Sequence, residues 1–345
     1  MPIPTAERPA PVTQRRELSH IAYGFMASKA LFAALEIDLF THLAGGSRTA
    51  AELATVTGVA PNRLRTLLHA LVGLGLATVD PHGYANAPAC QRYLVHGAPD
   101  DFGDYFRLQI SRQIYPALVH LDEGIAGTGE AFHTLGGLLS HPTDARTFTR
   151  AQHAGSLASA RVLAERVDLT EARGMLDVGG GSGAFSIALC AHNPALGATV
   201  LDFPSVLDIA REYREEAGLA DRITLLAGDA VHIAWPPNQD VVLLSYLLSA
   251  LGAEEIDVVL AKAHACLRPG GLLIVHDFML DDDRSGPALA ALWFLQYVAY
   301  RHDGVSFTAD DLAARLGTLG FTSPSRDVLI PEITKVLLSR KVTRP

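Results

Sequence analysis

The stretch Leu176-Asp177-Val178-Gly179-Gly180-Gly181-Ser182-Gly183 decides the fold of this chain. The residues before the glycines read as the end of a strand, and Ala184-Phe185-Ser186-Ile187 open a helix. Glycines allow a tight turn and let the backbone approach a ligand where a Cβ would clash. The first turn of the helix offers unpaired N–H groups. The stretch therefore predicts a strand–loop–helix cradle for a polar small molecule.

The spacing of the glycines excludes two common nucleotide-binding loops. The stretch lacks the G-x-x-x-x-G-K-[ST] pattern of a phosphate-binding loop. Gly179, Gly181 and Gly183 are spaced by two residues, which differs from the G-x-G-x-x-G pattern of dinucleotide-binding folds.

The pattern D-x-G-x-G-x-G resembles motif I of the class I S-adenosylmethionine (SAM) methyltransferases. The resemblance implies that Asp177 faces the cationic end of the cofactor and that Asp202, which ends the next apolar run, holds the ribose. Asp202-Phe203-Pro204 matches the D-L-P element of the family, and Asp229 stands where the family contacts adenine. The implied cofactor is SAM, with S-adenosylhomocysteine as its product. The cofactor-binding residues so expected are Asp177, Gly179, Gly181, Asp202, Phe203, Gly228, Asp229, Ala230 and Ser245.

The segments after the glycine-rich loop alternate between strand and helix patterns. Apolar runs at 223–227 and 241–247 read as strands, and Cys266-Leu267-Arg268-Pro269-Gly270-Gly271-Leu272 resembles the family's L-x-P-G-G-x-L turn before a further strand. A last helix and two closing strands follow. Such alternation predicts an α/β fold, a Rossmann-like domain with a mostly parallel sheet over residues 169–345.

The N-terminal part reads as helices followed by a small hairpin. A helical pattern runs over residues 15–45 and ends at Gly45-Gly46-Ser47. Thr49-Ala50-Ala51-Glu52 matches a capping box, and Pro61 starts a further helix. The segment 76–85 reads as a hairpin. Helix–turn–helix plus hairpin predicts a winged helix.

The strings Ala51-Glu52-Leu53-Ala54, Leu64-Arg65-Thr66-Leu67-Leu68 and Leu74-Gly75-Leu76 resemble the dimerisation domain of plant and bacterial small-molecule O-methyltransferases. That family includes acetylserotonin and caffeate O-methyltransferases. The resemblance implies a homodimer built by an α-helical winged-helix domain. We therefore expect a flexible tail at 1–14, this domain at 15–100, a helical linker contributing to the acceptor pocket at 101–168, and the SAM domain at 169–345.

Length and composition indicate the number of domains, the cellular location and the class of binding partner. A chain of 345 residues suits two domains, and no uncharged apolar run is long enough to predict a membrane span. Three separated cysteines and the absence of a signal-peptide core favour a cytoplasmic location. The formal charge of −9 argues against nucleic-acid binding. A DNA-binding regulator remains an alternative because of the winged helix, although Arg63, Arg65 and His69 form a thin basic surface.

The catalytic residue of the family is missing. O-methyltransferases of this family use a histidine after the fourth strand, in an L-H-x-W context, as general base. Here Leu248-Ser249-Ala250-Leu251 places Ser249 at that position, and serine is a poor base. His276, after the fifth strand, and His302 are candidates for the base. Tyr246 and Ser249 are expected to face the space of methyl transfer.

Residues on several segments are expected to contact the acceptor: Tyr105, Arg112, His153, Trp293, Gln296 and Asp277. His276, Asp277 and His302 could instead hold a metal, but their spacing specifies no coordination geometry, and we expect no metal.

The sequence thus predicts methyl transfer from SAM to a small-molecule acceptor, with a hydroxyl in secondary metabolism as the leading expectation. Because a thioether or tertiary amine has no proton to lose, Ser249 also leaves S-, C- or N-methylation open. A SAM-binding protein that catalyses a different reaction is the further alternative.

Overall fold

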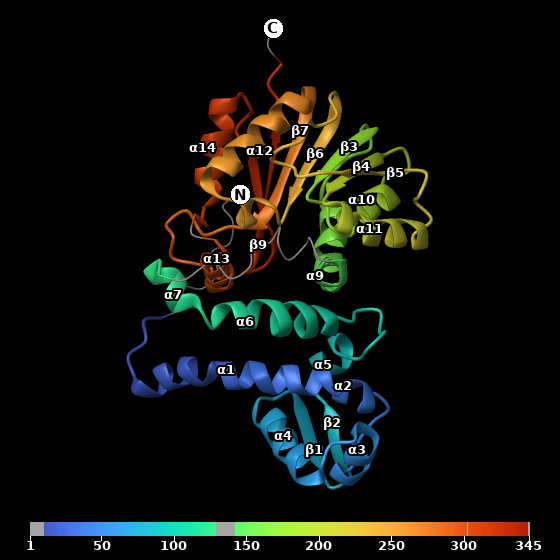
Figure 1. Cartoon of the computed structure of the whole chain (residues 1–345), viewed down its shortest axis with the longest axis vertical. Helices are drawn as coiled ribbons and strands as arrows, with labels where there is room; N and C mark the ends of the chain where they lie inside the picture. The colour runs from blue at the N-terminus through green and yellow to red at the C-terminus, as the bar shows by residue number, and fades with distance from the viewer. Residues whose placement is uncertain (1–9, 129–141, 302, 344–345) are drawn as a thin grey trace. The chain divides into compact units, whose positions relative to one another are not determined.

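The chain divides after Tyr115 into two compact units, each with its own hydrophobic core. The computed structural model describes residues 10–128, 142–301 and 303–343 (Figure 1).

The N-terminal unit contains the expected helices and hairpin. A capping box starts α3: Thr49 Oγ1 accepts a bond from the Glu52 N–H at 3.3 Å, and the Glu52 carboxylate accepts one from the Thr49 N–H at 2.7 Å. Fully buried leucines join the helices beneath the hairpin, which confirms the predicted order. The elements are α1 Arg15–Glu36, α2 Leu39–His42, α3 Ala50–Thr57, α4 Pro61–Gly73, β1 Ala77–Asp80, β2 Gly83–Asn86, α5 Pro88–Tyr93 and the π-helix η1 Tyr105–Ile114.

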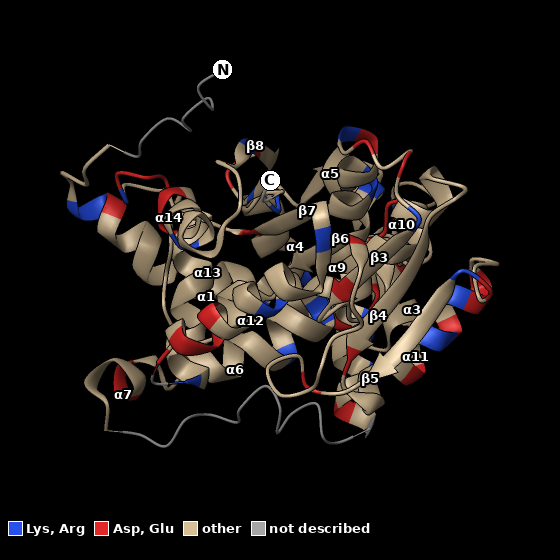
Figure 2. Cartoon of the chain, turned by 90° about the horizontal axis from the view of Figure 1, so that it is seen from above, with Lys and Arg blue, Asp and Glu red and all other residues tan. Residues whose placement is uncertain are grey.

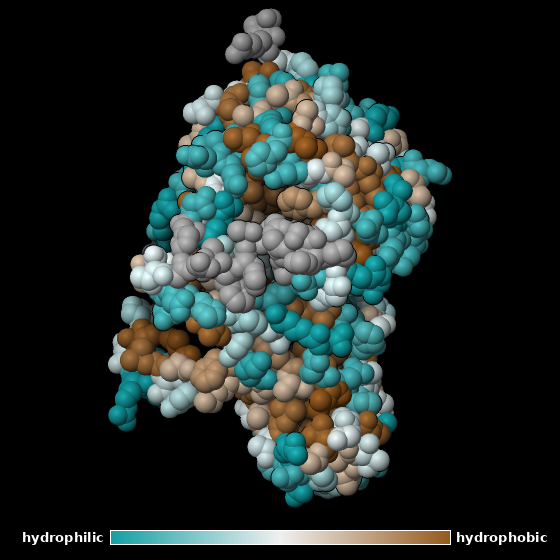
Figure 3. Space-filling model, in the orientation of Figure 1, coloured by the Kyte–Doolittle hydropathy of each residue, from teal (hydrophilic) through white to brown (hydrophobic). Residues whose placement is uncertain are grey.

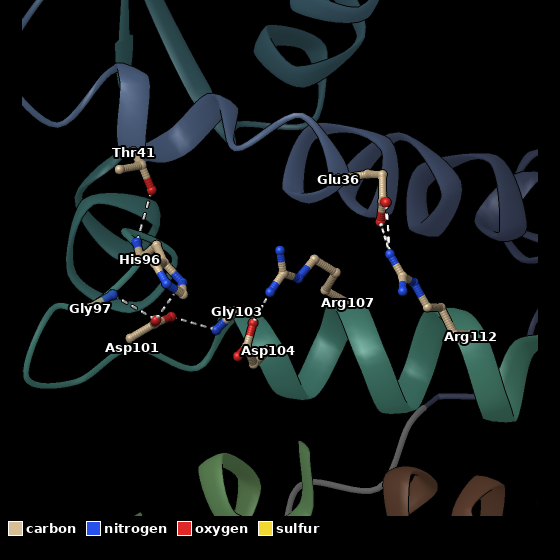
Figure 4. Close-up of polar contacts among 9 residues, drawn as sticks. All are labelled: Glu36, Thr41, His96, Gly97, Asp101, Gly103, Asp104, Arg107 and Arg112. Atoms are coloured by element: carbon tan, nitrogen blue, oxygen red, sulfur yellow. Dashed lines mark hydrogen bonds and ion pairs between the residues drawn. The ribbon is translucent and has the colours of Figure 1, made fainter. Parts of the chain in front are cut away.

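The first helix is shorter than the hydrophobic pattern suggested. The pattern continued to residue 45, but α1 ends at Glu36, and Asp38 adopts a left-handed conformation with φ 54° before α2 begins. A left-handed residue cannot continue a right-handed helix, so the chain turns there. Arg112 of η1 forms an ion pair with Glu36 at the end of α1: its Nη2 lies 2.7 Å from Glu36 Oε1 and 2.9 Å from Oε2 (Figure 4).

Helix α1 exposes a long apolar surface. Leu18, Ile21, Phe25 and Met26 are each more than half exposed, and hydrophobic surface is visible at this end of α1 in Figure 3. By length and composition alone, α1 is the one helix among the described residues that could cross a membrane, and 17% of its apolar window is buried. The expectation that the chain has no membrane span stays a prediction.

The C-terminal unit is built on a seven-stranded sheet in the order β5-β4-β3-β6-β7-β9-β8. The five strands from β5 to β7 run parallel, and β9 and β8 close the sheet in antiparallel pairing. This confirms the mostly parallel α/β sheet. The strands are β3 Gly174–Val178, β4 Gly197–Asp202, β5 Ile223–Ala227, β6 Gln239–Ser245, β7 Leu267–Phe278, β8 Ser325–Ile330 and β9 Thr334–Arg340.

Helices cover both faces of this sheet. Leucines of α9, α10 and α11 pack on one face, and apolar residues of α12, α13 and α14 pack on the other. Acidic and basic residues both occur along α11 (Figure 2). The helices are α6 Tyr115–Leu118, α7 Leu121–Ala126, α9 Pro142–Arg166, α10 Ala184–His192, α11 Pro204–Glu216, η2 Leu248–Ala250, α12 Ala253–Cys266, α13 Ala288–Tyr300 and α14 Ala309–Leu319.

The strand residues alternate between the two cores. Leu176 and Val242 face the core under α12, whereas the adjacent Met175 and Leu243 face the core under α9 and α10. Successive side chains of a strand point to opposite faces, so a sheet covered on both sides needs apolar residues at every position. This explains why the strands read as continuous apolar runs.

Adjacent valines on α12 test the packing of this face. Val259 is fully buried, and its neighbour Val258 is 40% exposed. Val259→Ala should lower the free energy of unfolding by about 2 kcal/mol, because it removes buried methyl groups and leaves a cavity. Val258→Ala should change it by less than about 0.5 kcal/mol. Both tryptophans, Trp235 and Trp293, lie in the C-terminal unit, so their fluorescence during urea unfolding follows this unit. Equal effects of the two substitutions would contradict the burial of this helix face.

Candidate active site

The carboxyl ends of the five parallel strands meet at one edge of the sheet. The strand order reverses between β3 and β6, since β4 and β5 lie on one side of β3 and β7 lies on the far side of β6. Open α/β sheets bind ligands in the crevice at such a reversal. The expected cofactor residues lie at this edge, at the ends of β3, β4, β5 and β6.

The glycine-rich loop joins β3 to α10 in a conformation that needs glycine. Gly179, Gly181 and Gly183 have φ values of 65°, 59° and 77°, in the left-handed region that side chains disfavour. A Cβ on Gly179 would stand 2.9 Å from Leu247 Cδ1, whereas nothing lies within 4 Å of a Cβ built on Gly181. The loop is therefore closed against β6 at its start and opens to free space at Gly181.

Two carboxyl groups lie beneath and beside this loop. Asp177 is buried and accepts a hydrogen bond from Ser186 Oγ at 2.6 Å. Asp202 ends β4, where Oδ2 accepts the Gly181 N–H at 2.8 Å and Oδ1 accepts the Phe203 N–H at 2.7 Å. Removal from water raises the pKa of each carboxyl to about 6. Both groups are thus ionised at neutral pH, and Asp202 ties the loop to the neighbouring strand.

The turn after β5 is held by a lysine that sequence reasoning missed. Lys262 on α12 donates to the carbonyls of Ala230, Val231 and Ile233 at 3.1, 2.5 and 2.8 Å. Asp229 Oδ1 caps the turn by accepting the Val231 N–H at 2.8 Å. A lysine on a helix gives no local sequence signal for such a role.

Gly228, just before Asp229, donates its N–H to the Asp202 carbonyl at 3.0 Å. Gly228 has a φ of 156°, and a Cβ at this position would stand 2.7 Å from Ile233 Cδ1. Both features disfavour a larger residue. The expected adenine-side residues therefore lie on a fixed turn next to Asp202.

His276 has partners on both ring nitrogens. Nδ1 lies 2.9 Å from Ser245 Oγ on β6, and Nε2 lies 2.9 Å from Thr334 Oγ1 on β9. The side chain is fully buried, and burial lowers its pKa to about 3, so the imidazole is neutral. A role for His276 as general base stays a prediction, and it requires one of these hydrogen bonds to open. Thr334 carries no sequence signal, because only the pairing of β9 with β7 brings it near.

Tyr246 follows β6 in a left-handed conformation with φ 54°. Its hydroxyl lies 2.9 Å from Ser159 Oγ on α9, and its ring contacts the His276 ring with centroids 4.5 Å apart. Burial raises the pKa of the phenol, so it stays protonated. A non-glycine residue in this region stores strain, which is frequent at functional sites.

Ser249 and Asp277 meet behind η2. The Asp277 carboxylate is fully buried, and its Oδ2 accepts the Ser249 N–H at 3.0 Å while Oδ1 accepts the Phe278 N–H at 2.8 Å. Burial raises the pKa of Asp277 to about 6. Ser249 Oγ is buried and has no hydrogen-bond partner.

The segment that carries Ser249 is fixed by Arg301. The guanidinium donates to the Ala250 carbonyl at 2.8 Å and forms ion pairs with Glu255 at 2.8 Å and Asp303 at 2.7 Å. Asp303 also restricts residue 252 to glycine, because a Cβ on Gly252 would stand 2.2 Å from Asp303 Oδ2. His302, the other candidate base, lies outside the described residues.

Helix α13 presents polar atoms beside Asp277. Trp293 stacks on Phe278 with ring centroids 4.3 Å apart, and the Tyr297 hydroxyl lies near Ser249 and Trp293. Trp293 Nε1 and Gln296 Nε2 are buried without hydrogen-bond partners. Residues three and four apart share one helix face, which accounts for this grouping of Trp293, Gln296 and Tyr297.

His153 on α9 lies against the glycine-rich loop. Its Nδ1 is 2.8 Å from Ser182 Oγ, and its ring stacks flat on Tyr213 of α11 at 3.7 Å. Burial lowers its pKa to about 4, so it is neutral. Contact of His153 with the acceptor stays a prediction; the structure gives it a contact with the cofactor loop.

Tyr105 and Arg112 lie on η1 in the N-terminal unit. Tyr105 packs against Phe102 with centroids 4.7 Å apart, and Arg112 pairs with Glu36. Their expected contact with the acceptor stays a prediction. Among the described residues, no group of three or more His, Cys, Asp or Glu side chains is placed to hold a metal ion.

Comparison with known proteins gives two family matches. Residues 19–96 match the O-methyltransferase dimerisation domain, and residues 127–322 match the O-methyltransferase domain.

Individual relatives agree with these matches. The tetracenomycin polyketide synthesis 8-O-methyl transferase TcmO of Streptomyces glaucescens is 31% identical, over 89% of this chain and 91% of its own length. The 3-hydroxy-5-methyl-1-naphthoate 3-O-methyltransferase of Streptomyces sahachiroi is also 31% identical, over 91% and 93%. Human N-acetylserotonin methyltransferase, solved in complex with SAM, has the same fold, with a TM-score of 0.86 at 24% identity over 97% of this chain and all of that one. The chain therefore belongs to the O-methyltransferase family of SAM-dependent enzymes.

Proposed function

We propose that this enzyme methylates a hydroxyl group on an aromatic small molecule. Its membership of the O-methyltransferase family supports transfer to oxygen. One observation supports an aromatic acceptor: Trp293 and Phe278 stack on each other beside the buried Asp277 carboxylate. The two rings offer a flat apolar surface next to a polar group. Small-molecule sites typically combine aromatic walls with a few placed polar groups. The naphthoate named for one relative is an acceptor of this kind.

The residues at the sheet edge fit SAM as the cofactor. The backbone opens to free space at Gly181, and Asp202 presents a carboxylate beside it that can accept hydrogen bonds from ribose hydroxyls. We assign Asp177 to the electrostatics behind the loop, and Phe203, Gly228, Asp229 and Ala230 to the adenosine side. SAM, when bound, supplies an electrophilic methyl group on a positively charged sulfur. The protein contributes position and charge, which dominate catalysis of such transfers.

An acceptor assay tests this function directly. The enzyme with SAM should add one methyl group to a hydroxyl of naphthol or hydroxynaphthoate probes, detected by product mass and by the carbon–proton coupling of the new methyl ether. Thioether, amine and 2-oxo-acid probes should gain no methyl group. Methylation of one of those classes alone would replace this proposal with S-, N- or C-methylation.

Substitution of Asp202 tests the cofactor site. Asp202→Asn should weaken S-adenosylhomocysteine binding by about tenfold to a hundredfold in calorimetry, because a hydrogen bond to a charged group contributes about 1.5–3 kcal/mol. The matched control is Asp208→Asn, which removes an exposed carboxylate of α11 and should leave affinity unchanged.

The same site should respond to pH. With a pKa of about 6, Asp202 is ionised above that pH and protonated below it. Affinity for S-adenosylhomocysteine should therefore fall as pH drops through 6. In Asp202→Asn this step should become smaller, and Asp177, whose pKa is also raised to about 6, accounts for what remains. A wild-type affinity that stays flat down to pH 5, about one unit below that pKa, would contradict the assignment.

We infer that the enzyme is a homodimer, joined through the N-terminal unit. The exposed apolar residues of α1 support this, because monomers rarely expose large apolar patches. Ile21→Glu combined with Phe25→Glu should yield a monomer in light scattering. Val79→Glu, at a 54% exposed valine on β1, should leave the dimer intact. A wild-type monomer at micromolar concentration would overturn the inference.

We also infer a cytoplasmic location without nucleic-acid or membrane partners. Cys90, Cys190 and Cys266 are buried free thiols, which suits a reducing compartment.

A further inference from the structure

Three buried polar side-chain atoms on α13 and η2 have no hydrogen-bond partners. These atoms are Ser249 Oγ, Trp293 Nε1 and Gln296 Nε2. An unpaired buried donor or acceptor costs about 1–3 kcal/mol, and folded proteins rarely tolerate several in one place. Such a group persists where a ligand or a proton-transfer step uses it. Ser249 has no solvent exposure, so an acceptor reaches its hydroxyl only when the surrounding side chains move apart.

The neighbours of the Ser249 hydroxyl are a carboxylate and a phenol. The Ser249 side chain lies close enough to interact with both the Asp277 carboxylate and the Tyr297 hydroxyl. Asp277 is held by the N–H groups of Ser249 and Phe278, one on each oxygen. Each carboxylate oxygen has a second lone pair, so both can still accept a proton. Arg301 holds the turn in place through the Ala250 carbonyl.

The other candidate bases that the structure describes at this edge are occupied. His276 is bonded at both ring nitrogens, and the Tyr246 hydroxyl is bonded to Ser159. Asp277 is the remaining titratable group at the end of β7 among the described residues, and it faces the element that carries Ser249.

We propose that Ser249 and Asp277 form a proton relay that replaces the histidine base of the family, with the Asp277 carboxylate as the final proton acceptor. The inference rests on the proposed function, because it concerns the proton of a hydroxyl acceptor. Ser249 is the residue that touches the acceptor, and Asp277 acts through it.

The step balances without any added reactant. The acceptor O–H bond breaks and its proton passes to Ser249 Oγ, while the Ser249 proton passes to the Asp277 carboxylate. The electron pair left on the acceptor oxygen forms the bond to the methyl group, whose former bonding pair stays on the cofactor sulfur. After the ether product leaves, Asp277 returns its proton to water by the same route.

The surroundings set the ionisation of Asp277. Facing it are the phenols of Tyr246 and Tyr297, and Lys335 lies opposite on β9 with its ammonium bonded to Asp281 and the Leu280 carbonyl. No cation within the described part of the chain pairs with this carboxylate, and burial raises its pKa to about 6. That value leaves Asp277 ionised at neutral pH and closer to the pH of the reaction than an exposed aspartate, as a general base requires.

The first test needs no acceptor. The aspartate carboxyls are labelled with carbon-13 and followed by NMR, and the Asp277 resonance is assigned by its absence in Asp277→Asn. In the enzyme bound to S-adenosylhomocysteine, Asp277 should titrate near pH 6. Ser249→Ala should shift that titration. The relay would be overturned if Asp277 remained protonated at pH 8, about two units above that value. An Asp277 titration unchanged by Ser249→Ala would also overturn it.

The second test separates proton removal from structural damage. Two naphthols serve as probes, one neutral at the assay pH and one whose nitro groups keep it ionised. Asp277→Asn should lower kcat/KM for the neutral naphthol by about a hundredfold or more, while that for the ionised one changes by less than about threefold. Ser249→Ala should show the same contrast. Unchanged binding of S-adenosylhomocysteine controls for folding.

The outcomes distinguish the relay from the proposed function. Equal losses on both naphthols would mean that Asp277 is structural and would overturn the relay. If the wild-type enzyme methylates neither naphthol, the proposed aromatic acceptor fails, and the carboxyl titration alone then decides the relay.

Discussion

The hydrogen bond from the Gly181 N–H to the Asp202 carboxylate, 2.8 Å long, joins the two parts on which the site depends. One is a loop whose left-handed glycines turn β3 into α10, and the other is the carboxyl end of the neighbouring strand. Parallel strands make this meeting possible, because their carboxyl ends share one edge of the sheet. The sheet can be parallel because helices cover both of its faces. The same edge then gathers Ser249 from η2, which follows β6, and Asp277 from β7.

Local sequence patterns predicted the parts of this arrangement that are local. The glycine spacing after Asp177, the apolar strand runs and the capping box at Thr49 are features of neighbouring residues, and the structure contains each of them. The end of α1 was misplaced, because apolar spacing continues through a left-handed residue at Asp38 that the pattern does not register.

Contacts between distant segments could not be predicted in the same way. The pairing of β7 with β9 brings Thr334 to His276, and α12 brings Lys262 to the turn after β5. Neither residue belongs to a motif. His276 illustrates the limit: its sequence position made it a candidate base, and only the structure shows that it is buried with a hydroxyl partner on each ring nitrogen. The sequence shows that Ser249 stands where the family has its histidine base. Only the structure shows that the Asp277 carboxylate contacts Ser249.

The open side of the glycine-rich loop, with Asp202, is the cofactor site that we propose. A crystal structure with S-adenosylhomocysteine tests it most directly. We predict ribose hydroxyls bonded to the Asp202 carboxylate and the cofactor backbone lying over Gly181, with Ser249 and Asp277 on the side of the sulfur. Cofactor density elsewhere on the chain, or a ribose with no contact to Asp202, would contradict the account.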